Sequence, residues 1–329
     1  MKISKSFTHT WKTPAGEAIT SVVAVKGADL SAFQAQANAA VKDYREDLNT
    51  LYLVFDKFVA DGTTYTATTK VGGVIAGKIQ GSVGMTMHTG FDINFIITKD
   101  SYALLDAATQ ALFTEAENYY VFTEAAERAV NQAFTDAVYT LTVVDGEYTY
   151  ALTYKANVVD YVTKTFSYAA STDKDKTMAY SIAAYLNSAY AYFTNKDVED
   201  YSELAKIVTD NADYKADVTF AESTTNIGTA TGHLDIAIDL DSTPAWAITS
   251  DVNGTVKFNG ETYTLVAGEE TIIEASVMKF DNVLTFNLEG GLTGTYDLAA
   301  YVERMSGDGA TLDALLAAFY TYVIYADKF

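Results

Sequence analysis

A Tyr-rich pattern that occurs twice constrains the fold of this chain more than any other feature. The segments "YLNSAYAYF" (185–193) and "YTYVIYADKF" (320–329) share the spacing Tyr-x3-Ala-x2-aromatic, which falls on Tyr185, Ala189 and Tyr192 and again on Tyr322, Ala326 and Phe329. Steps of four and three place each trio on one face of a helix. Farther upstream, "FSYAAS" from Phe166 matches "YDLAAY" from Tyr296. The chain is therefore predicted to be duplicated, and each Tyr-rich helix is predicted to bury its stripe against a β-sheet.

Alternation of apolar and polar residues predicts the strands of both copies. In the first copy, "FDINFIIT" (91–98) and "NYYVFT" (118–123) precede "VYTLTVVDGEYTYALTY" (138–154), whose Asp145-Gly146 pair is typical of a hairpin turn. The segment "FTEAAERAVNQAFTD" (122–136) is predicted to be a short helix at the edge of the sheet. In the second copy, "HLDIAIDLD" (233–241) and "NVLTFNLEGG" (282–291) alternate, and Asn253-Gly254 and Asn259-Gly260 are predicted turns.

The N-terminal region has a different organisation. Apolar residues in "DLSAFQAQANAAVKDY" (29–44) recur at helical spacing, with Asp29 as the predicted N-cap, and "LYLVFDKFV" (51–59) and "TTYTATTKV" (63–71) predict a hairpin. The Gly-rich "VGGVIAGKIQGSVG" (71–84) marks a boundary near residue 80. The sequence thus predicts an α+β, mainly β fold: an N-terminal α/β segment (1–80) and two tandem β-sandwich-like (Ig-like) units (81–212 and 213–329), each closed by its C-terminal Tyr-rich helix.

The segments "FSYAAS", "AAYLNSAYAYF", "TYDLAAY" and "AAFYTYVIYADKF" together resemble an uncharacterised module near the C-termini of large secreted and cell-surface proteins of Clostridia and related Firmicutes. Its helix motif has the form LxNYGxxAQxYF. This chain departs from the motif at Leu186, where the module has Gly, and at Tyr190, where it has Gln. The resemblance covers about residues 85–329 and implies an extracellular or cell-surface location, without implying any catalytic residue.

Charge and cysteine content exclude several classes of partner and site. A formal charge of -21 repels nucleic acid and anionic membrane surfaces. With no Cys, the chain has no disulfide, thiolate zinc site or Cys nucleophile, which fits a secreted Gram-positive protein or a virion component. The beginning, "MKISKSFTHTWKTPAGEA", is basic but lacks the apolar region of a signal peptide, and no uncharged stretch is long enough to span a membrane.

No catalytic motif supports an enzymatic reading. His9, His88 and His233 are far apart in the sequence, and no G-x-S-x-G elbow, Walker A loop or dinucleotide fingerprint is present. With 43 acidic residues, a carboxylate pair at glycosidase spacing arises by chance, so a glycoside hydrolase would need a groove with two carboxylates. We therefore expect no enzymatic activity.

Two weak candidate sites remain. Asp239 and Asp241 lie on one face at the predicted end of a strand and are candidate ligands for a structural calcium ion; the alternative is that they are solvated charges. Trp246 and Trp11 could stack on a glycan if they were exposed, whereas a Trp closing the end of a sandwich is the alternative. Asn253-Gly254-Thr255 is a formal glycosylation sequon, but a turn is the role that we expect for it.

These observations lead to two functional hypotheses. The first is a non-catalytic structural or assembly protein of the cell surface, a filament or a virion, which presents tandem β units to copies of itself or to another surface protein. Its N-terminal segment "MKISKSFTHTWKT" (1–13), polar and strand-prone, is the predicted inter-subunit arm. The second is a carbohydrate-binding or adhesion module of an extracellular surface protein, with a glycan as its partner.

Overall fold

The chain forms two compact units of mixed α and β structure. The computed structural model describes residues 5–47, 51–74, 79–145, 148–193, 201–220, 222–223, 225–240 and 243–328. One unit consists of residues 1–80 with 100–103, and the other of residues 81–99 with 104–329. Strands contain more residues than helices, which confirms an α+β fold that is mainly β. The division of residues 81–329 into two tandem domains stays a prediction.

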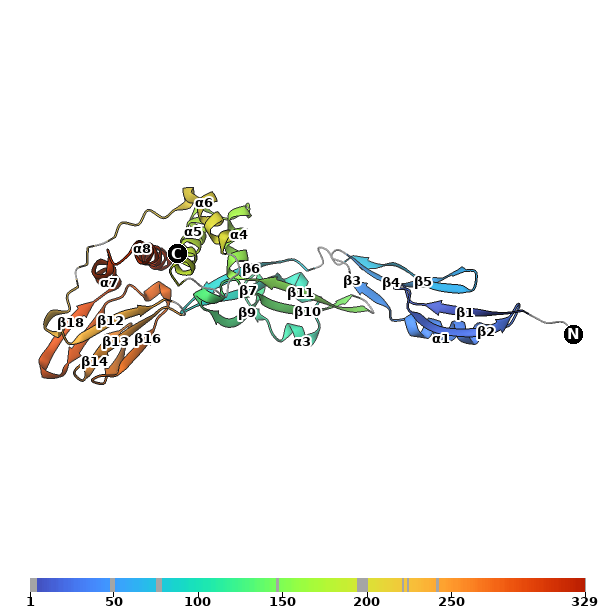
Figure 1. Cartoon of the computed structure of the whole chain (residues 1–329), viewed down its shortest axis with the longest axis horizontal. Helices are drawn as coiled ribbons and strands as arrows, with labels where there is room; N and C mark the ends of the chain where they lie inside the picture. Colours follow the sequence, from blue (N-terminus) through green and yellow to red (C-terminus); the bar gives the residue numbers. More distant parts are fainter. Residues whose placement is uncertain are drawn as a thin grey trace. The chain divides into compact units, whose positions relative to one another are not determined.

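The first unit is a five-stranded sheet with one long helix (Figure 1). Its strands are β1 (Ser6–Lys12), β2 (Ala18–Val25), β3 (Arg45–Asp47), β4 (Leu51–Asp61) and β5 (Thr64–Val74), in the order β2-β1-β5-β4-β3. Strand β1 runs parallel to β5, and the other neighbours are antiparallel. The predicted hairpin is present as β4 and β5, with Gly62 at a φ of 60° in its turn. Helix α1 (Ser31–Val41) packs along β1 and β2.

Trp11 is the centre of the core beneath α1. Its side chain is 1% exposed, its ring stacks on Tyr65 at 4.7 Å and on Phe33 of α1 at 6.2 Å, and its Nε1 donates to Gln34 Oε1 at 2.9 Å. The prediction of an inter-subunit arm is therefore wrong for residues 6–12, because they form an inner strand of this sheet. Asp29 is not the N-cap of α1 either: Leu30 occupies that position, while Asp29 Oδ1 accepts a hydrogen bond from the Ser31 N–H at 2.9 Å.

The second unit begins with a four-stranded sheet and a long hairpin. The sheet contains β6 (Gly81–Met87), β7 (Phe91–Thr98), β8 (Thr114–Glu115) and β9 (Tyr119–Arg128) in the order β6-β7-β9-β8, and the hairpin consists of β10 (Ala137–Asp145) and β11 (Tyr148–Ala156). Short helices α3 (Ala107–Gln110) and η1 (Val130–Gln132) lie between these strands, whereas most of α2 (Lys99–Tyr102) belongs to the first unit. The predicted helix over 122–136 is wrong, because residues up to Arg128 pair with β7 in β9 and this pairing overrides local helix propensity.

Seven further strands form two separate sheets in the C-terminal part of this unit. One sheet has the order β12 (Leu234–Asp239), β13 (Ala245–Ser250), β16 (Glu270–Glu274), and the other has the order β15 (Glu261–Leu265), β14 (Gly254–Phe258), β17 (Leu284–Leu288), β18 (Leu292–Tyr296). Asn259 and Gly260 turn the hairpin of β14 and β15 with φ values of 52° and 89°. Asn253-Gly254 is not a hairpin turn, since it connects β13 to β14 in different sheets.

Two helix pairs follow strands in a similar way. Helices α4 (Val158–Ser167) and α5 (Asp173–Phe193) follow β11, and α7 (Leu298–Met305) and α8 (Ala310–Asp327) follow β18. Asn157 caps α4 and Asp297 caps α7, each by accepting from the backbone N–H three residues later at 2.8 Å. Tyr161 and Tyr301 lie four residues beyond these caps. The predicted match of "FSYAAS" with "YDLAAY" is wrong in register, because the first ends α4 while the second begins α7.

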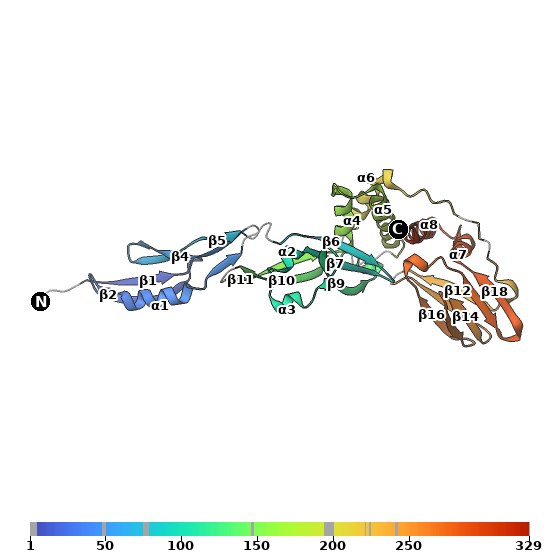
Figure 2. The ribbon, with the colours of Figure 1, turned by 180° about the vertical axis from the view of Figure 1, so that it is seen from behind.

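The two Tyr-rich helices pack against each other (Figure 2). Tyr185 of α5 and Tyr322 of α8 occupy equivalent positions in the repeated pattern, and their rings stack at 5.4 Å with an interplanar angle of 16°. Both side chains are buried, at 0% and 2% exposed. Phe329, the last residue of the second pattern, lies outside the described residues. Helices α5 and α8 are therefore in direct contact through residues at matching positions of the repeated sequence pattern. Helix α6 (Ser202–Asp210) packs on α5.

Candidate interaction surface

Both tryptophans that were candidates for glycan stacking lie in the core. Trp246 in β13 is 0% exposed; its ring stacks on Phe280 at 5.1 Å and meets Tyr296 and Tyr301 edge to face. Trp11 is enclosed beneath α1, as described above. A sugar could reach either indole only by displacing its packing partners. Both side chains therefore contribute to stability. Glycan binding through either indole stays a prediction, and neither ring is exposed to support it.

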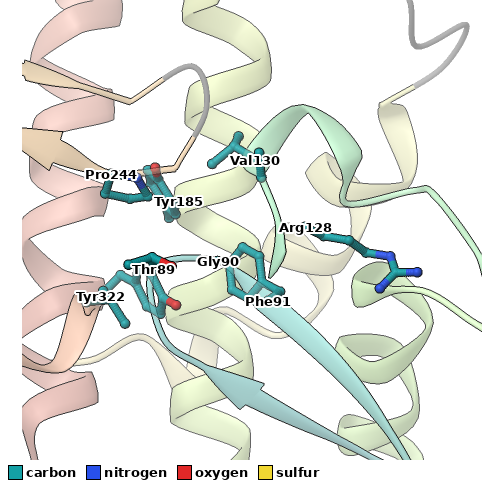
Figure 3. A pocket seen from close by; sticks show the side chains of 10 residues that line it. Thr89, Gly90, Phe91, Arg128, Val130, Tyr185, Pro244 and Tyr322 are labelled. Atoms are coloured by element: carbon teal, nitrogen blue, oxygen red, sulfur yellow. The ribbon is translucent and has the colours of Figure 1, made fainter. Parts of the chain in front are cut away.

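The aromatic core around Tyr185 encloses a cavity too small for a ligand (Figure 3). Tyr185, Tyr322, Phe91 and Pro244 are among its lining residues, and its free space of about 10 Å³ is what one water molecule needs. Arg128 also lines it, but its guanidinium points away from both tyrosines, donating from Nε to Thr135 O at 2.9 Å and from Nη2 to Glu124 Oε2 at 2.5 Å. The cavity has room for a buried water and for nothing larger.

Buried tyrosines should make the second unit sensitive to alkaline pH. Burial raises the pKa of Tyr139, Tyr190 and Tyr296 from 10.0 to about 12. As pH rises, the unfolded chain releases these protons near pH 10, but the folded chain releases them only near pH 12. The free energy of unfolding should therefore fall between pH 10 and pH 12. Below pH 10 these groups should not affect it. Urea unfolding across the window would show the fall. The variant Tyr296→Phe should lose less stability there, and an equal loss in both proteins would contradict this assignment.

The candidate calcium ligands and the histidines do not form a metal centre among the described residues. Asp239 ends β12 opposite Ala245, and Asp241 lies outside the described residues. The Nδ1 atoms of His9 and His233 lie 3.2 Å from Tyr65 Oη and 2.8 Å from Asp251 Oδ1, and the carbonyl oxygen of His88 accepts from the Val277 N–H. In the part of the chain that the structure describes, no three acidic or His side chains converge as ligands would. A structural calcium ion stays a prediction.

Two open hollows lie on the second unit. Asn226, Thr229, Thr285, Asn287 and Thr293 line one of them, which has no titratable side chain in its lining. Glu222 and Glu303 line the other with Phe220 and Val302, and both carboxylates are exposed to solvent. Neither hollow encloses a reacting group away from water.

The edge of the C-terminal sheet at β18 is covered by the chain itself. The Thr295 N–H donates to Asn226 O at 2.7 Å, and Thr229 Oγ1 accepts from the Thr293 N–H at 2.9 Å. Gly294 permits this close approach, because a Cβ there would lie 1.7 Å from Ile227 O. At the opposite sheet, edge strand β12 carries Asp235 and Asp239. Coverage and charge are two ways in which proteins keep sheet edges from pairing with other chains.

One edge of the first unit has neither form of protection. Strand β2, with the sequence "AITSVVAV", ends the sheet and contains no charged residue. Val23 and Val25 are 66% and 47% exposed. At the other edge, β3 has three residues, Arg-Glu-Asp, all charged. The two edges of the same sheet thus differ in length, charge and exposed apolar surface.

The backbone of β2 presents hydrogen-bonding groups outward. The Thr10 N–H of β1 donates to Thr63 O on the β5 side at 2.9 Å, so it points away from β2. Ser21 is the antiparallel partner of Thr10, and its N–H and C=O must therefore point away from β1. The same holds two residues later for Val23, opposite Thr8. Within residues 5–47 the structure shows no backbone partner for these outward groups of Ser21 and Val23.

The sequence predictions missed β2, although a signal was present. Eight successive uncharged residues rich in Val, Ile and Thr have high strand propensity. The strand lacks the regular alternation of a half-buried strand, because its two faces are both partly apolar. Another long strand with an open side, β11, carries Lys155.

Neither the chain nor any part of it matches a family model, and no curated protein or solved structure is detectably similar to it. Among the described residues, no helix has both the length and the apolar character needed to cross a membrane.

Proposed function

We propose that this chain is a non-catalytic structural protein that associates with copies of itself and presents its β units on the assembled surface. The observation that supports this most strongly is strand β2, an uncharged, exposed edge whose outward backbone groups have the geometry for adding another strand. The same chain covers the β18 edge with residues 225–230 and places charge on β3 and β12. An edge left open beside protected ones is expected where pairing with another chain is the function.

The finer architecture and the location belong to the same proposal. We interpret the two C-terminal sheets as a β-sandwich of Ig-like type, and the paired helices α5 and α8 as the closure of both repeated halves. The resemblance of the Tyr-rich segments to a module of clostridial surface proteins supports an extracellular or cell-surface location, with a filament or a virion as the alternatives. The high negative charge would keep such a surface soluble.

Placing a charge in the middle of β2 should abolish association. In Val23→Lys the ammonium group would lie at a strand–strand contact, whereas the 66% exposure of Val23 means that the fold of the single chain should be little affected. Light scattering of the variant should give the monomer mass of 35.7 kDa at concentrations where the wild type is heavier. Adding millimolar calcium to both proteins would also test the candidate calcium site.

The matched control is Val59→Lys on β4. Val59 is 48% exposed. It pairs with Thr66, whose neighbour Tyr65 points toward α1, so Val59 lies on the face of the sheet away from α1, as Val23 does. Unlike β2, however, β4 is not an edge strand. This variant should associate as the wild type does. If both variants lose association equally, the added charge disrupts it wherever it is placed, and β2 is not the specific contact. A wild type that stays monomeric would contradict the proposed function.

A further inference from the structure

We infer that the partner of β2 is the β2 strand of a second copy, paired antiparallel about a two-fold axis at Val22. This inference rests on the proposed function and specifies its contact. The result is one continuous sheet built from two copies of the first unit. Because a two-fold contact uses the same surface on both partners, it closes at two chains. Growth into a filament or shell would need a second contact elsewhere.

The charges that flank β2 determine its direction of pairing. Glu17 precedes the strand and Lys26 follows it; both are exposed, and within the described residues neither takes part in an ion pair. Antiparallel pairing about Val22 sets Glu17 of one copy opposite Gly27 of the other, next to Lys26, at both ends of the contact. Parallel pairing in register would instead place Glu17 beside Glu17 and Lys26 beside Lys26. Like charges at both ends oppose the parallel arrangement.

The outward backbone groups determine the register. Strands β1 and β2 pair without interruption from Thr20 to Val25, and a register shift near Ala18 ends the regular part. Within Thr20–Val25, the outward residues are Ser21, Val23 and Val25, and the Val25 C=O already accepts from the Ala28 N–H at 3.1 Å, so Ser21 and Val23 are the two whose N–H and C=O both lack a backbone partner among residues 5–47. Placing Val22 opposite the second copy's Val22 sets Ser21 opposite Val23 on each side of the axis. The N–H and C=O groups of Ser21 and Val23 in each copy are then all satisfied. They form one hydrogen-bonded pair on either side of the non-hydrogen-bonded Val22 pair.

The size of this contact predicts a reversible dimer. One strand of eight residues buries less surface than the roughly 1,200–2,000 Å² of stable complexes. Association should therefore depend on protein concentration. Because exposed ion pairs are screened by salt, it should also weaken at high ionic strength.

Charge reversal tests the direction of pairing. In Glu17→Lys and in Lys26→Glu, each alone, both ends of the antiparallel contact become repulsive, and we expect the dimer dissociation constant to rise about tenfold at low salt. The double variant restores opposite charges and should return to the wild-type value. An equimolar mixture of the two single variants should form a mixed dimer. A double variant no tighter than the single ones would overturn the antiparallel arrangement.

Disulfide trapping tests the register, and it is unambiguous because the chain has no native Cys. Val22→Cys places two thiols opposite each other in a non-hydrogen-bonded pair. The Cα atoms of such a pair lie about 4.5 Å apart, a distance that permits a disulfide. Val25→Cys is the control: Val25 lies opposite Ile19, so the two copies of residue 25 are six positions apart along the strands, or about 20 Å. Oxidation should link the first variant as a dimer and leave the second unlinked.

The outcomes separate this inference from the proposed function. If the wild type associates but Val22→Cys links no faster than Val25→Cys, the inferred contact is wrong and the assembly role stands on another surface. If the wild type remains monomeric at every concentration and neither variant links, both fall.

Discussion

Deleting residues 1–13 is expected to unfold the first unit. The deletion removes β1, which pairs with β2 on one side and β5 on the other. It also removes Trp11, whose truncation to alanine alone would cost about 3–5 kcal/mol for a side chain so well buried. Since a whole domain has only about 5–15 kcal/mol of stability, the loss of an inner strand and this side chain should exceed what the unit has.

Hydrogen exchange and limited proteolysis would measure this loss. Amides of β4 and β5 should lose protection, and the unit should become the first site of cleavage. A shorter deletion, of residues 1–4, leaves β1 whole and should leave the unit folded. A chain lacking residues 1–13 that keeps a protected first unit and loses only its association would show that β1 is a separable arm, contrary to the structure.

Replacing Trp246 by alanine is expected to lower the free energy of unfolding of the second unit by about 3–5 kcal/mol. Its indole is fully enclosed between the sheets and the paired helices, where Phe280 stacks on it and in turn packs against Phe319 of α8 at 5.2 Å. The cavity left behind would lie beside Phe280, Tyr296 and Tyr301. Urea unfolding followed by circular dichroism would report the change.

Two variants serve as controls for this effect. Trp246→Phe keeps an aromatic ring and removes an indole N–H that has no acceptor among the described residues, so its cost should be well below that of alanine. Tyr168→Ala, at a side chain 65% exposed, should change stability by less than about 0.5 kcal/mol. An unchanged unfolding midpoint in Trp246→Ala would instead point to an accessible ring and would renew the glycan hypothesis.

Local periodicity predicted the elements that depend on their own residues. Helices α1 and α5 and the hairpin of β4 and β5 follow from spacing and turn chemistry that lie within a single segment. The helix wrongly predicted at 122–136 has helix-forming residues, but its first half is held in β9 by pairing with β7. Long-range pairing of this kind cannot be read from a window of the sequence.

The placement of side chains depended on tertiary contacts as well. The repeated tyrosine pattern predicted a buried stripe, and Tyr185 and Tyr322 are buried, but Tyr192 is 39% exposed. Tyr185 stacks on Tyr322 of the other Tyr-rich helix, a contact that only the three-dimensional arrangement reveals. Trp246 lies within two residues of Pro244, in a segment that resembles a loop, and strand pairing on both sides encloses it. The candidate interaction edge is open only because of the order of strands in the sheet, so its composition alone could not identify it.

Hydrogen exchange at the backbone amides of Ser21 and Val23, measured on the wild-type protein over a range of concentrations, tests the central claim most directly. If β2 pairs with a second chain, these two outward N–H groups should exchange rapidly in dilute solution and become protected as the protein associates, while the inward amide of Val22 remains protected throughout. Rapid exchange of Ser21 and Val23 at every concentration, in a sample that light scattering shows to be assembled, would contradict the account.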